Sequence, residues 1–210
     1  MTRPSVLVLA CGALARELEA AFKVNRVDNV KVEYLSAALH NRPERICEML
    51  RTRLASVRRS FDRVFLGYAD CGTGGRLDAV LQRWNVRRLP GAHCYEFFAT
   101  SEIFHALAEA EPGTFYLTDF LVRHFDRLVI EDLKLNTHPE LRETLFAHYT
   151  RVVYLSQTQE SELLESAQRA ADQLALPLEV VVTGMGDLQT AMAAEIPRWQ
   201  ENPGGNHATH

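Results

Sequence analysis

The chain has 210 residues, 47% of them hydrophobic, so it is long enough to bury a full core in one domain or in two lobes. Its 23 basic and 27 acidic residues give a formal net charge of −4, which excludes a broadly basic surface for nucleic acid or anionic lipid. No apolar run is long enough to span a bilayer, and the N-terminus lacks the pattern of a signal peptide. We therefore expect a cytoplasmic protein whose thiols stay reduced, with no nucleic-acid or membrane partner.

Apolar runs and helical periodicity predict alternating strands and helices along the first half of the chain. Strands are expected at residues 6–9, 30–35, 63–68 and 86–89, and helices at residues 12–22, 43–57, 76–84 and 95–110. Pro43 suits the first turn of its helix, and Pro112 with Gly113 ends the last of these helices. This half of the chain is therefore predicted to form successive βα units.

The second half continues the alternation, with one ambiguous segment. Residues 114–117 fit either a strand or the start of the helix that carries Leu128. Helices are predicted at 139–149 and 160–174, and strands at 151–155 and 178–182. Asp187 is placed to cap a last short helix that ends before Pro197.

This order of elements predicts the α/β class, with a mainly parallel sheet flanked by helices. Two similar lobes, with a crevice at the C-terminal ends of the strands, fit the same pattern. We expect a single domain over residues 1–196, with a candidate lobe break at residues 111–113. Residues 197–210 are polar and rich in glycine, which predicts a flexible tail.

Three cysteines each lie just past a predicted strand: Cys11, Cys71 and Cys94. In an open α/β sheet, ligands bind beyond the carboxyl ends of the strands, so we predict that these thiols converge as metal ligands. Three protein ligands with an open fourth position are typical of catalytic zinc, and the same sulfurs also suit an iron–sulfur cluster. Buried packing without a metal is the remaining alternative. Cys47 falls at helical spacing among apolar residues and is predicted to be core.

His93, Glu96 and Asp70 lie next to these cysteines in the sequence. His93 is the neighbour of Cys94, and on an extended stretch adjacent side chains point to opposite sides, so His93 is not predicted to be a ligand. Glu96, at the start of a helix, fits a fourth metal ligand, a general acid/base or a residue placed for the helix dipole. We interpret His93, Glu96 and Asp70 as the candidate catalytic residues.

Glycines and polar residues beside the same strand ends are candidates for binding a cofactor. Such glycines permit close approach of a ligand, and the loop amides can hold an anion. The candidates are Gly12, Gly72, Gly74 and Gly75, together with His40 and Asn41 after the second strand. The glycine loop is not a Walker loop, because the Lys-Ser/Thr ending is missing. A tight turn that happens to contain a cysteine explains the loop equally well.

Six segments make the chain similar to a known family. They are ACGAL at 10–14, LHN at 39–41, DCGTGG at 70–75, RLPGAHCYEFF at 88–98, GTFYLTDFL at 113–121 and VVYLSQ at 152–157. Together they resemble the bacterial and archaeal family called domain of unknown function 1638. Ala69 departs from its pattern, which usually has glycine before the aspartate of the DCG motif.

The resemblance implies an association with corrinoid-dependent methyl transfer from methylamines and betaines, and with tetrahydrofolate one-carbon metabolism. The chain lacks the D-x-H-x-x-G pattern of a protein that binds corrinoid through histidine. A corrinoid or methyltransferase protein is therefore a candidate partner, alongside a small-molecule substrate. The leading hypothesis is a zinc-thiolate protein of one-carbon or methyl-transfer metabolism, and, if it is an enzyme, a metal-dependent methyl or one-carbon transferase. The alternatives are an iron–sulfur enzyme and a non-enzymatic accessory or cofactor-binding protein.

Overall fold

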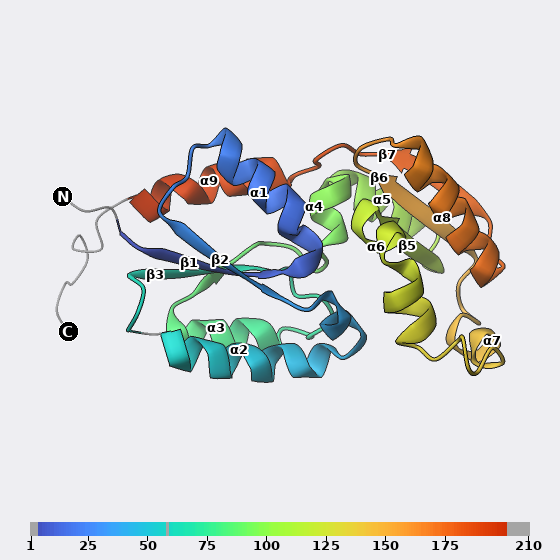
Figure 1. Ribbon diagram of the computed structural model, residues 1–210, viewed down its shortest axis with the longest axis horizontal. Coiled ribbons are helices and arrows are strands. Elements are labelled where there is room, and N and C mark those ends of the chain that lie inside the picture. The colour runs from blue at the N-terminus through green and yellow to red at the C-terminus, as the bar shows by residue number, and fades with distance from the viewer. Residues whose placement is uncertain (1–3, 58, 201–210) are drawn as a thin grey trace. The chain divides into compact units, whose positions relative to one another are not determined.

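The computed structural model describes residues 4–57 and 59–200, which divide into two compact units (Figure 1). Unit 1 takes the described residues up to 94 and from 188 onward, and unit 2 takes residues 95–187. Each unit contains a parallel β-sheet with helices, which confirms the predicted α/β class. The chain thus divides at two points within the expected domain of residues 1–196. The candidate break at 111–113 lies inside unit 2, where Gly113 O accepts a hydrogen bond from Thr150 N (2.7 Å).

The sheet of unit 1 has four parallel strands in the order β2-β1-β3-β4. These strands are β1 (Val6–Cys11), β2 (Val30–Leu35), β3 (Arg63–Gly67) and β4 (Arg87–Arg88). All of β1 is buried, because an unbroken apolar run can pack against helices on both faces of a parallel sheet. Gly67 lets the central strands approach closely, since a Cβ there would lie 2.8 Å from the Cβ of Ala10. The two central strands therefore meet tightly just before they end.

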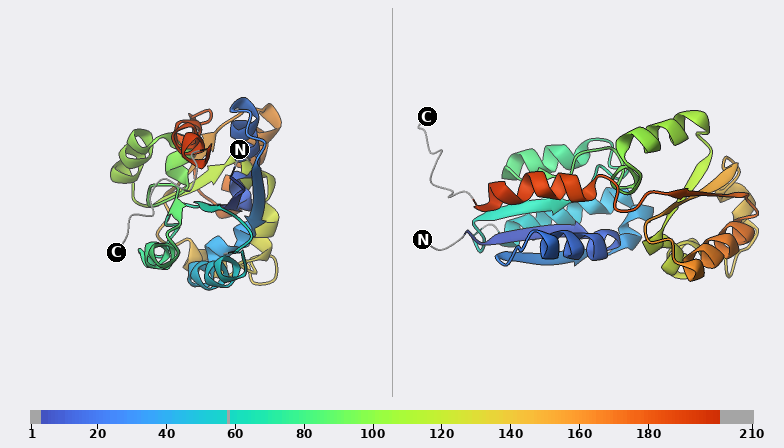
Figure 2. Two further views of the ribbon diagram at one scale, coloured as in Figure 1. Left: turned by 90° about the vertical axis from the view of Figure 1, so that its left-hand side faces the viewer. Right: turned by 90° about the horizontal axis from the view of Figure 1, so that it is seen from above.

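Helices cover both faces of this sheet (Figures 1 and 2). α1 (Ala15–Val24) and α9 (Leu188–Gln200) pack together on one face, and α2 (Pro43–Val57) and α3 (Arg76–Trp84) on the other. Two short 3₁₀ helices, η1 (Gly12–Leu14) and η2 (Ala37–Asn41), follow β1 and β2. This arrangement leaves the loops after the strands at one edge of the sheet.

The last helix continues through Pro197, whereas the sequence predicts that it ends before this residue. A proline inside a helix costs about 3 kcal/mol. Burial of Ile196 and Trp199 offsets this cost, at about 1.5–3 kcal/mol for each large apolar side chain. The Trp199 ring lies 6.1 Å from the ring of Phe22 and 5.3 Å from that of Phe65. Residues 197–200 therefore belong to α9, and the rest of the expected tail, 201–210, lies outside the described residues.

Unit 2 is built on a three-stranded parallel sheet in the order β5-β6-β7. The strands are β5 (Thr114–Thr118), β6 (Arg151–Ser156) and β7 (Leu178–Val182). The helices are α4 (Tyr95–Ala99), α5 (Ser101–Ala110), α6 (Asp119–Arg123), α7 (Leu141–Leu145) and α8 (Ser161–Leu174), with a π-helical turn η3 (Asp126–Glu131). The core of unit 2 gathers apolar residues of β5, β6 and α8 with those of α6 and the segment after it.

Three elements of unit 2 differ in detail from the prediction. The helix expected at 95–110 is divided at Thr100, which has φ +68° and whose hydroxyl accepts a hydrogen bond from Ile103 N (3.4 Å). The ambiguous segment at 114–117 is a strand, because it pairs with β6 along its whole length. The helix expected at 139–149 is reduced to α7, whose Leu141 and Leu145 are 37% and 44% exposed and so add little burial energy.

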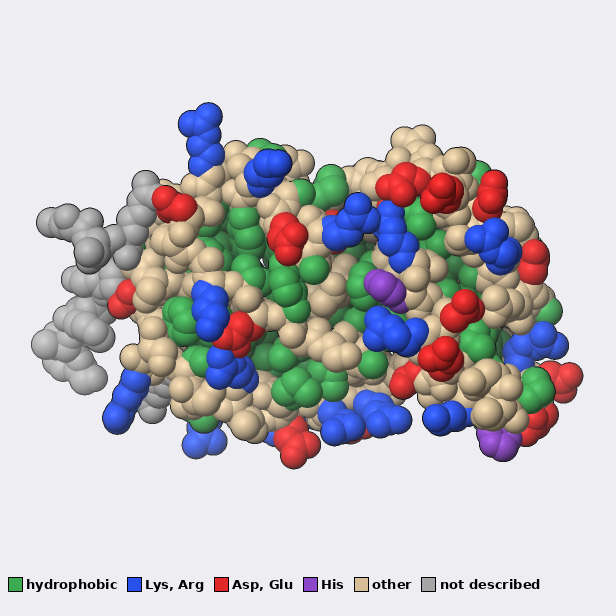
Figure 3. Space-filling view, in the orientation of Figure 1, with side chains coloured by type: hydrophobic (Ala, Val, Ile, Leu, Met, Phe, Trp, Pro, Cys, Tyr) green, Lys and Arg blue, Asp and Glu red, His purple; other side chains and the backbone are tan. Residues whose placement is uncertain are grey.

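The surface agrees with the balanced composition. On the face shown in Figure 3, basic and acidic side chains are interspersed rather than gathered by sign. Within residues 4–57 and 59–200, no helix combines the length and the apolar character needed to cross a membrane.

Candidate metal site

Each strand of the unit 1 sheet has at least one residue with a sulfur or an imidazole at or beyond its carboxyl end. Cys11 is the last residue of β1, and His40 lies in η2, after β2. Cys71 and Cys94 lie in the loops after β3 and β4. The chain runs from β1 to β2 on one side, and β3 then pairs with β1 on the other, so this edge is a topological switch point. Ligand sites of open α/β sheets form at such points.

His40, Cys71 and Cys94 are the residues that the fold brings into mutual reach. One ring nitrogen of His40 and the two sulfur atoms all lie within 4.8 Å of one another. The cysteines are 6% exposed or less. Ligand atoms about 2.0–2.3 Å from a tetrahedral zinc ion lie roughly 3.3–3.8 Å apart, so small side-chain movements suffice to close this group around one ion. The site can therefore hold a metal, as the sequence predicts for Cys71 and Cys94.

The hydrogen bonding of His40 fixes which of its nitrogens is available. His40 Nδ1 lies 3.0 Å from the carbonyl oxygen of Ala37. A carbonyl only accepts, so Nδ1 carries a hydrogen and the neutral ring keeps its lone pair on Nε2. Nε2 is buried and has no hydrogen-bond partner among the described residues. Histidines that bind metals show this pattern, with the second nitrogen donating to a carbonyl or carboxylate.

Cys11 reaches the same edge of the sheet but is not in this group. Its Sγ lies 3.9 Å from His40 Nδ1, the nitrogen that donates to Ala37. The same sulfur accepts a hydrogen bond from Ala13 N (3.3 Å) and so caps the start of η1. The sequence predicts Cys11 as the third ligand, whereas the group within mutual ligand reach contains His40 in its place. The reason is local, because the 3₁₀ turn after β1 directs the sulfur toward its own backbone.

The DCGTGG segment folds around the carboxylate of Asp70. This carboxylate accepts hydrogen bonds from Thr73 Oγ1 and from the amides of Gly74 and Gly75, both at 2.9 Å. Burial raises the pKa of Asp70, but these hydrogen bonds outweigh it and leave the pKa below its ordinary value. The amides predicted to cradle an anion therefore bind the chain's own carboxylate. Asp70 holds the loop that carries Cys71.

Backbone contacts join this loop to the one that carries Cys94. The amide of Cys71 donates to Ala92 O (3.0 Å), and the Arg88 side chain donates to carbonyl oxygens of the loop after β4. Cys71 has φ +49°, and Gly72 follows with φ +81°. A left-handed conformation is uncommon for cysteine, and strain of this kind is concentrated at functional sites. The two loops thus hold their cysteines in a fixed relation.

The charges at the site depend on these contacts. A hydrogen bond from Cys94, assisted by His40 and by the charge of His93, lowers the pKa of Cys71 to about 4. The same interaction and burial raise the pKa of Cys94. Burial lowers the pKa of His40, but its interactions with Cys11 and Cys71 outweigh this, so its pKa lies above the ordinary value. A bound cation would compete with protons for these groups.

The other predicted site residues have separate surroundings. A Cβ at Gly12 would lie 3.2 Å from Leu35 O, so this glycine serves the close approach of the ends of β1 and β2. Asn41 is exposed at the end of η2. Glu96 belongs to unit 2 and is buried there, where its carboxylate accepts a hydrogen bond from Ser101 Oγ (3.2 Å). The contacts of Gly12 and Glu96 thus lie outside the His40, Cys71 and Cys94 group.

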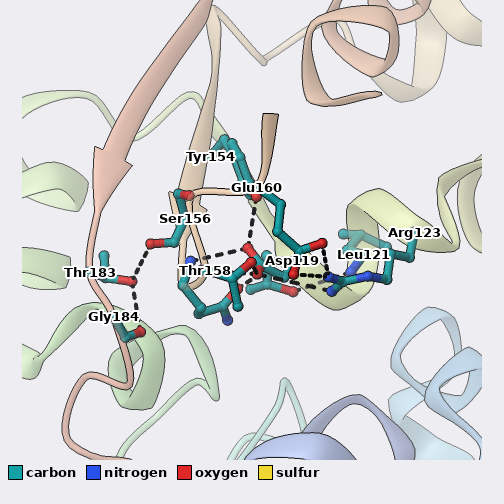
Figure 4. A network of polar contacts seen from close by, with 11 residues as sticks. Asp119, Leu121, Arg123, Tyr154, Ser156, Thr158, Glu160, Thr183 and Gly184 are labelled. Atoms are coloured by element: carbon teal, nitrogen blue, oxygen red, sulfur yellow. Dashed lines mark hydrogen bonds and ion pairs between the residues drawn. The ribbon is translucent and has the colours of Figure 1, made fainter. Parts of the chain in front are cut away.

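Unit 2 contains a buried polar network centred on one carboxylate (Figure 4). Asp119, directly after β5, is 2% exposed. Its carboxylate accepts hydrogen bonds from Tyr154 Oη (2.7 Å), Gln157 N (3.0 Å), and Thr158 N and Oγ1 (3.1 and 2.6 Å). Its own amide donates to Gln157 Oε1 (2.7 Å). Both carboxylate oxygens are occupied, so the network joins the ends of β5 and β6.

Comparison with known proteins gives one relationship. A family model described as "Protein of unknown function (DUF1638)" matches residues 34–192. No curated protein and no solved structure matches the chain. The matched range includes His40, Cys71 and Cys94 but begins after Cys11.

Proposed function

The chain belongs to the DUF1638 family, and from the geometry of unit 1 we propose that it binds a single metal ion through His40, Cys71 and Cys94. One observation carries the proposal. Nε2 of His40 is buried and makes no hydrogen bond within the described residues, while two buried thiols lie within ligand reach of the ring. A buried polar atom without a partner is unfavourable, and coordination of a cation by Nε2 satisfies it.

We propose zinc as the metal. Two thiolates and one imidazole form a donor set that suits Zn²⁺, and three protein ligands leave a fourth position open for a substrate or water. An iron–sulfur cluster is the alternative, but in a [4Fe–4S] cluster each cysteine binds a different iron, which needs more separation than a group within 4.8 Å provides. The compact spacing therefore favours a single ion.

The proposed role is in one-carbon or methyl-transfer metabolism. A bound zinc ion lowers the pKa of a coordinated thiol or water, which supplies a nucleophile at neutral pH. The chain's own residues exclude water, since both cysteines are buried, and His93 lies near enough for its charge to act on Cys71. We assign His93 the transfer of the proton, because it is the predicted catalytic residue whose charge acts on Cys71. The family resemblance supports a corrinoid or methyltransferase protein as partner, and we further propose a small-molecule substrate and a cytoplasmic location.

Elemental analysis of protein purified without a metal-chelating tag, with and without oxygen, tests the proposal. We expect one equivalent of zinc in the wild type, and its loss in His40→Ala, Cys71→Ser and Cys94→Ser. Cys47→Ser is the matched control, because Cys47 is a buried cysteine on α2 outside the group, and it should keep its metal. Cys11→Ser should keep it too. Loss of metal in Cys11→Ser alone would instead make Cys11 the ligand that the sequence predicts.

The other outcomes separate the alternatives. Iron with an equal amount of acid-labile sulfide would select a cluster. Zinc that binds but exchanges no exogenous ligand would select a non-enzymatic accessory protein. Absence of any metal under both conditions would overturn the proposal.

A further inference from the structure

A buried hydroxyl group lies beside the metal group without a partner. Tyr68, in the loop after β3, is 0% exposed. Its Oη makes no hydrogen bond with any residue in the described ranges 4–57 and 59–200. Burying a hydroxyl without a hydrogen bond is unfavourable, and native proteins do it rarely. This buried hydroxyl therefore has a hydrogen-bonding capacity that the described residues leave unused.

Tyr68 is in contact with the metal group itself. Its ring stacks on the ring of His40, with centroids 6.1 Å apart and planes at 12°. Burial raises the pKa of this hydroxyl most, followed by the charges of Cys11 and Cys71, a polar contact with the Cys11 side chain that falls outside hydrogen-bond geometry, and the charge of Cys94. A phenol is both a donor and an acceptor, and close to thiolates it acts as a donor. The site thus holds one spare hydrogen-bond donor next to its candidate ligands.

We propose that Tyr68 Oη donates a hydrogen bond to the non-protein ligand that occupies the open coordination position of the metal. This inference rests on the proposed function and extends it to the ligand. The ligand class is a small anion or a lone-pair group such as hydroxide, azide or a carboxylate. The protein residues supply the other three positions, and the phenol orients the fourth ligand. Tyr68 thereby selects ligands that accept a hydrogen bond.

The test uses Co²⁺ as a spectroscopic substitute for zinc and azide as the exogenous ligand. Tyr68→Phe should bind one equivalent of Co²⁺ with the sulfur-to-cobalt charge-transfer bands of the wild type. Its affinity for azide, followed by the visible cobalt bands, should fall about 10- to 100-fold, as expected for a hydrogen bond to a charged group. The metal-free variant should be at least as stable as the wild type in urea with EDTA, because the removed hydroxyl has no partner.

Tyr154→Phe is the matched control. Tyr154 is 1% exposed, and its hydroxyl donates to Asp119 (2.7 Å) in unit 2. This variant should show a lower urea midpoint and unchanged azide affinity, the opposite of Tyr68→Phe in both measurements. Unchanged azide affinity in Tyr68→Phe, or destabilisation of its metal-free form, would overturn the inference alone. Failure of the wild type to bind cobalt would overturn the proposed function and the inference together.

Discussion

Replacing Asp70 by alanine tests whether this residue positions Cys71 or takes part in chemistry. Its carboxylate accepts one hydroxyl and two amide hydrogen bonds within the loop that carries Cys71. Each such bond has a net value of about 0.5–1.5 kcal/mol. Water reaches part of this loop and compensates some of the loss, so we estimate that the ordered loop loses about 2 kcal/mol in Asp70→Ala.

This loss should appear in metal affinity. If only the ordered loop binds zinc, a loss of about 2 kcal/mol in the stability of this loop weakens the zinc affinity roughly 30-fold. This agrees with the 10- to 100-fold effects typical of residues that orient metal ligands. The assay is competition for zinc with a chromophoric chelator. Asp70→Asn keeps one acceptor oxygen and should give an intermediate affinity.

Asp62→Ala is the matched control in the same unit. Asp62 accepts hydrogen bonds from Ser5 N (2.7 Å) and Ser5 Oγ (2.8 Å), in a loop that carries no candidate ligand. Its loss should leave zinc affinity unchanged. Wild-type zinc affinity in Asp70→Ala would refute the reasoning. Such a result, with loss of methyl transfer, would instead support the catalytic role that the sequence suggests for Asp70.

Three further predictions follow from other parts of the chain. Asp119→Asn leaves a buried backbone N–H facing an amide group, so its free energy of unfolding should fall by about 3 kcal/mol in urea titrations. Asp126→Asn, at an exposed site, is the control and should stay within about 0.5 kcal/mol of the wild type. Removal of zinc by a chelator should lower the urea midpoint of unit 1, because its free energy of unfolding falls by about 4 kcal/mol when free zinc had been about 1,000 times its Kd. Tryptophan fluorescence reports this change, since both tryptophans lie in unit 1, and an unchanged midpoint would contradict metal binding to the folded state. Hydrogen bonds from Arg53 hold the pKa of Glu33 below its ordinary value of 4.5, so the stability that Glu33 adds relative to Glu33→Gln should be present above pH 4.5 and disappear on acidification. Equal acid sensitivity of the two proteins would contradict this assignment.

Several local features were predictable because they depend on neighbouring residues only. The buried run of β1 and the proline at the start of α2 are visible in the sequence, as is the placement of Cys71 and Cys94 after strands. Strand and helix periods differ, so their alternation predicts an α/β fold without coordinates. The burial of Cys47 follows from its spacing on a helix.

Other features depend on contacts between distant segments. Pairing with β6 decides that residues 114–117 form a strand. Contacts of the Trp199 ring with rings of α1 and β3 allow α9 to continue through Pro197. The chain forms two sheets because of which strands pair with each other. The hydrophobic pattern of each strand would be the same in a single sheet, so the pattern does not reveal this division.

The sequence by itself therefore determined the α/β class, the family resemblance and the placement of thiols at strand ends, since these follow from residue order and local periodicity. Only the tertiary structure decided that His40, rather than Cys11, joins Cys71 and Cys94. The physical reason is that ligand reach depends on side-chain direction. A 3₁₀ turn directs the sulfur of Cys11 to Ala13 N, and a hydrogen bond to Ala37 leaves His40 Nε2 as the free nitrogen.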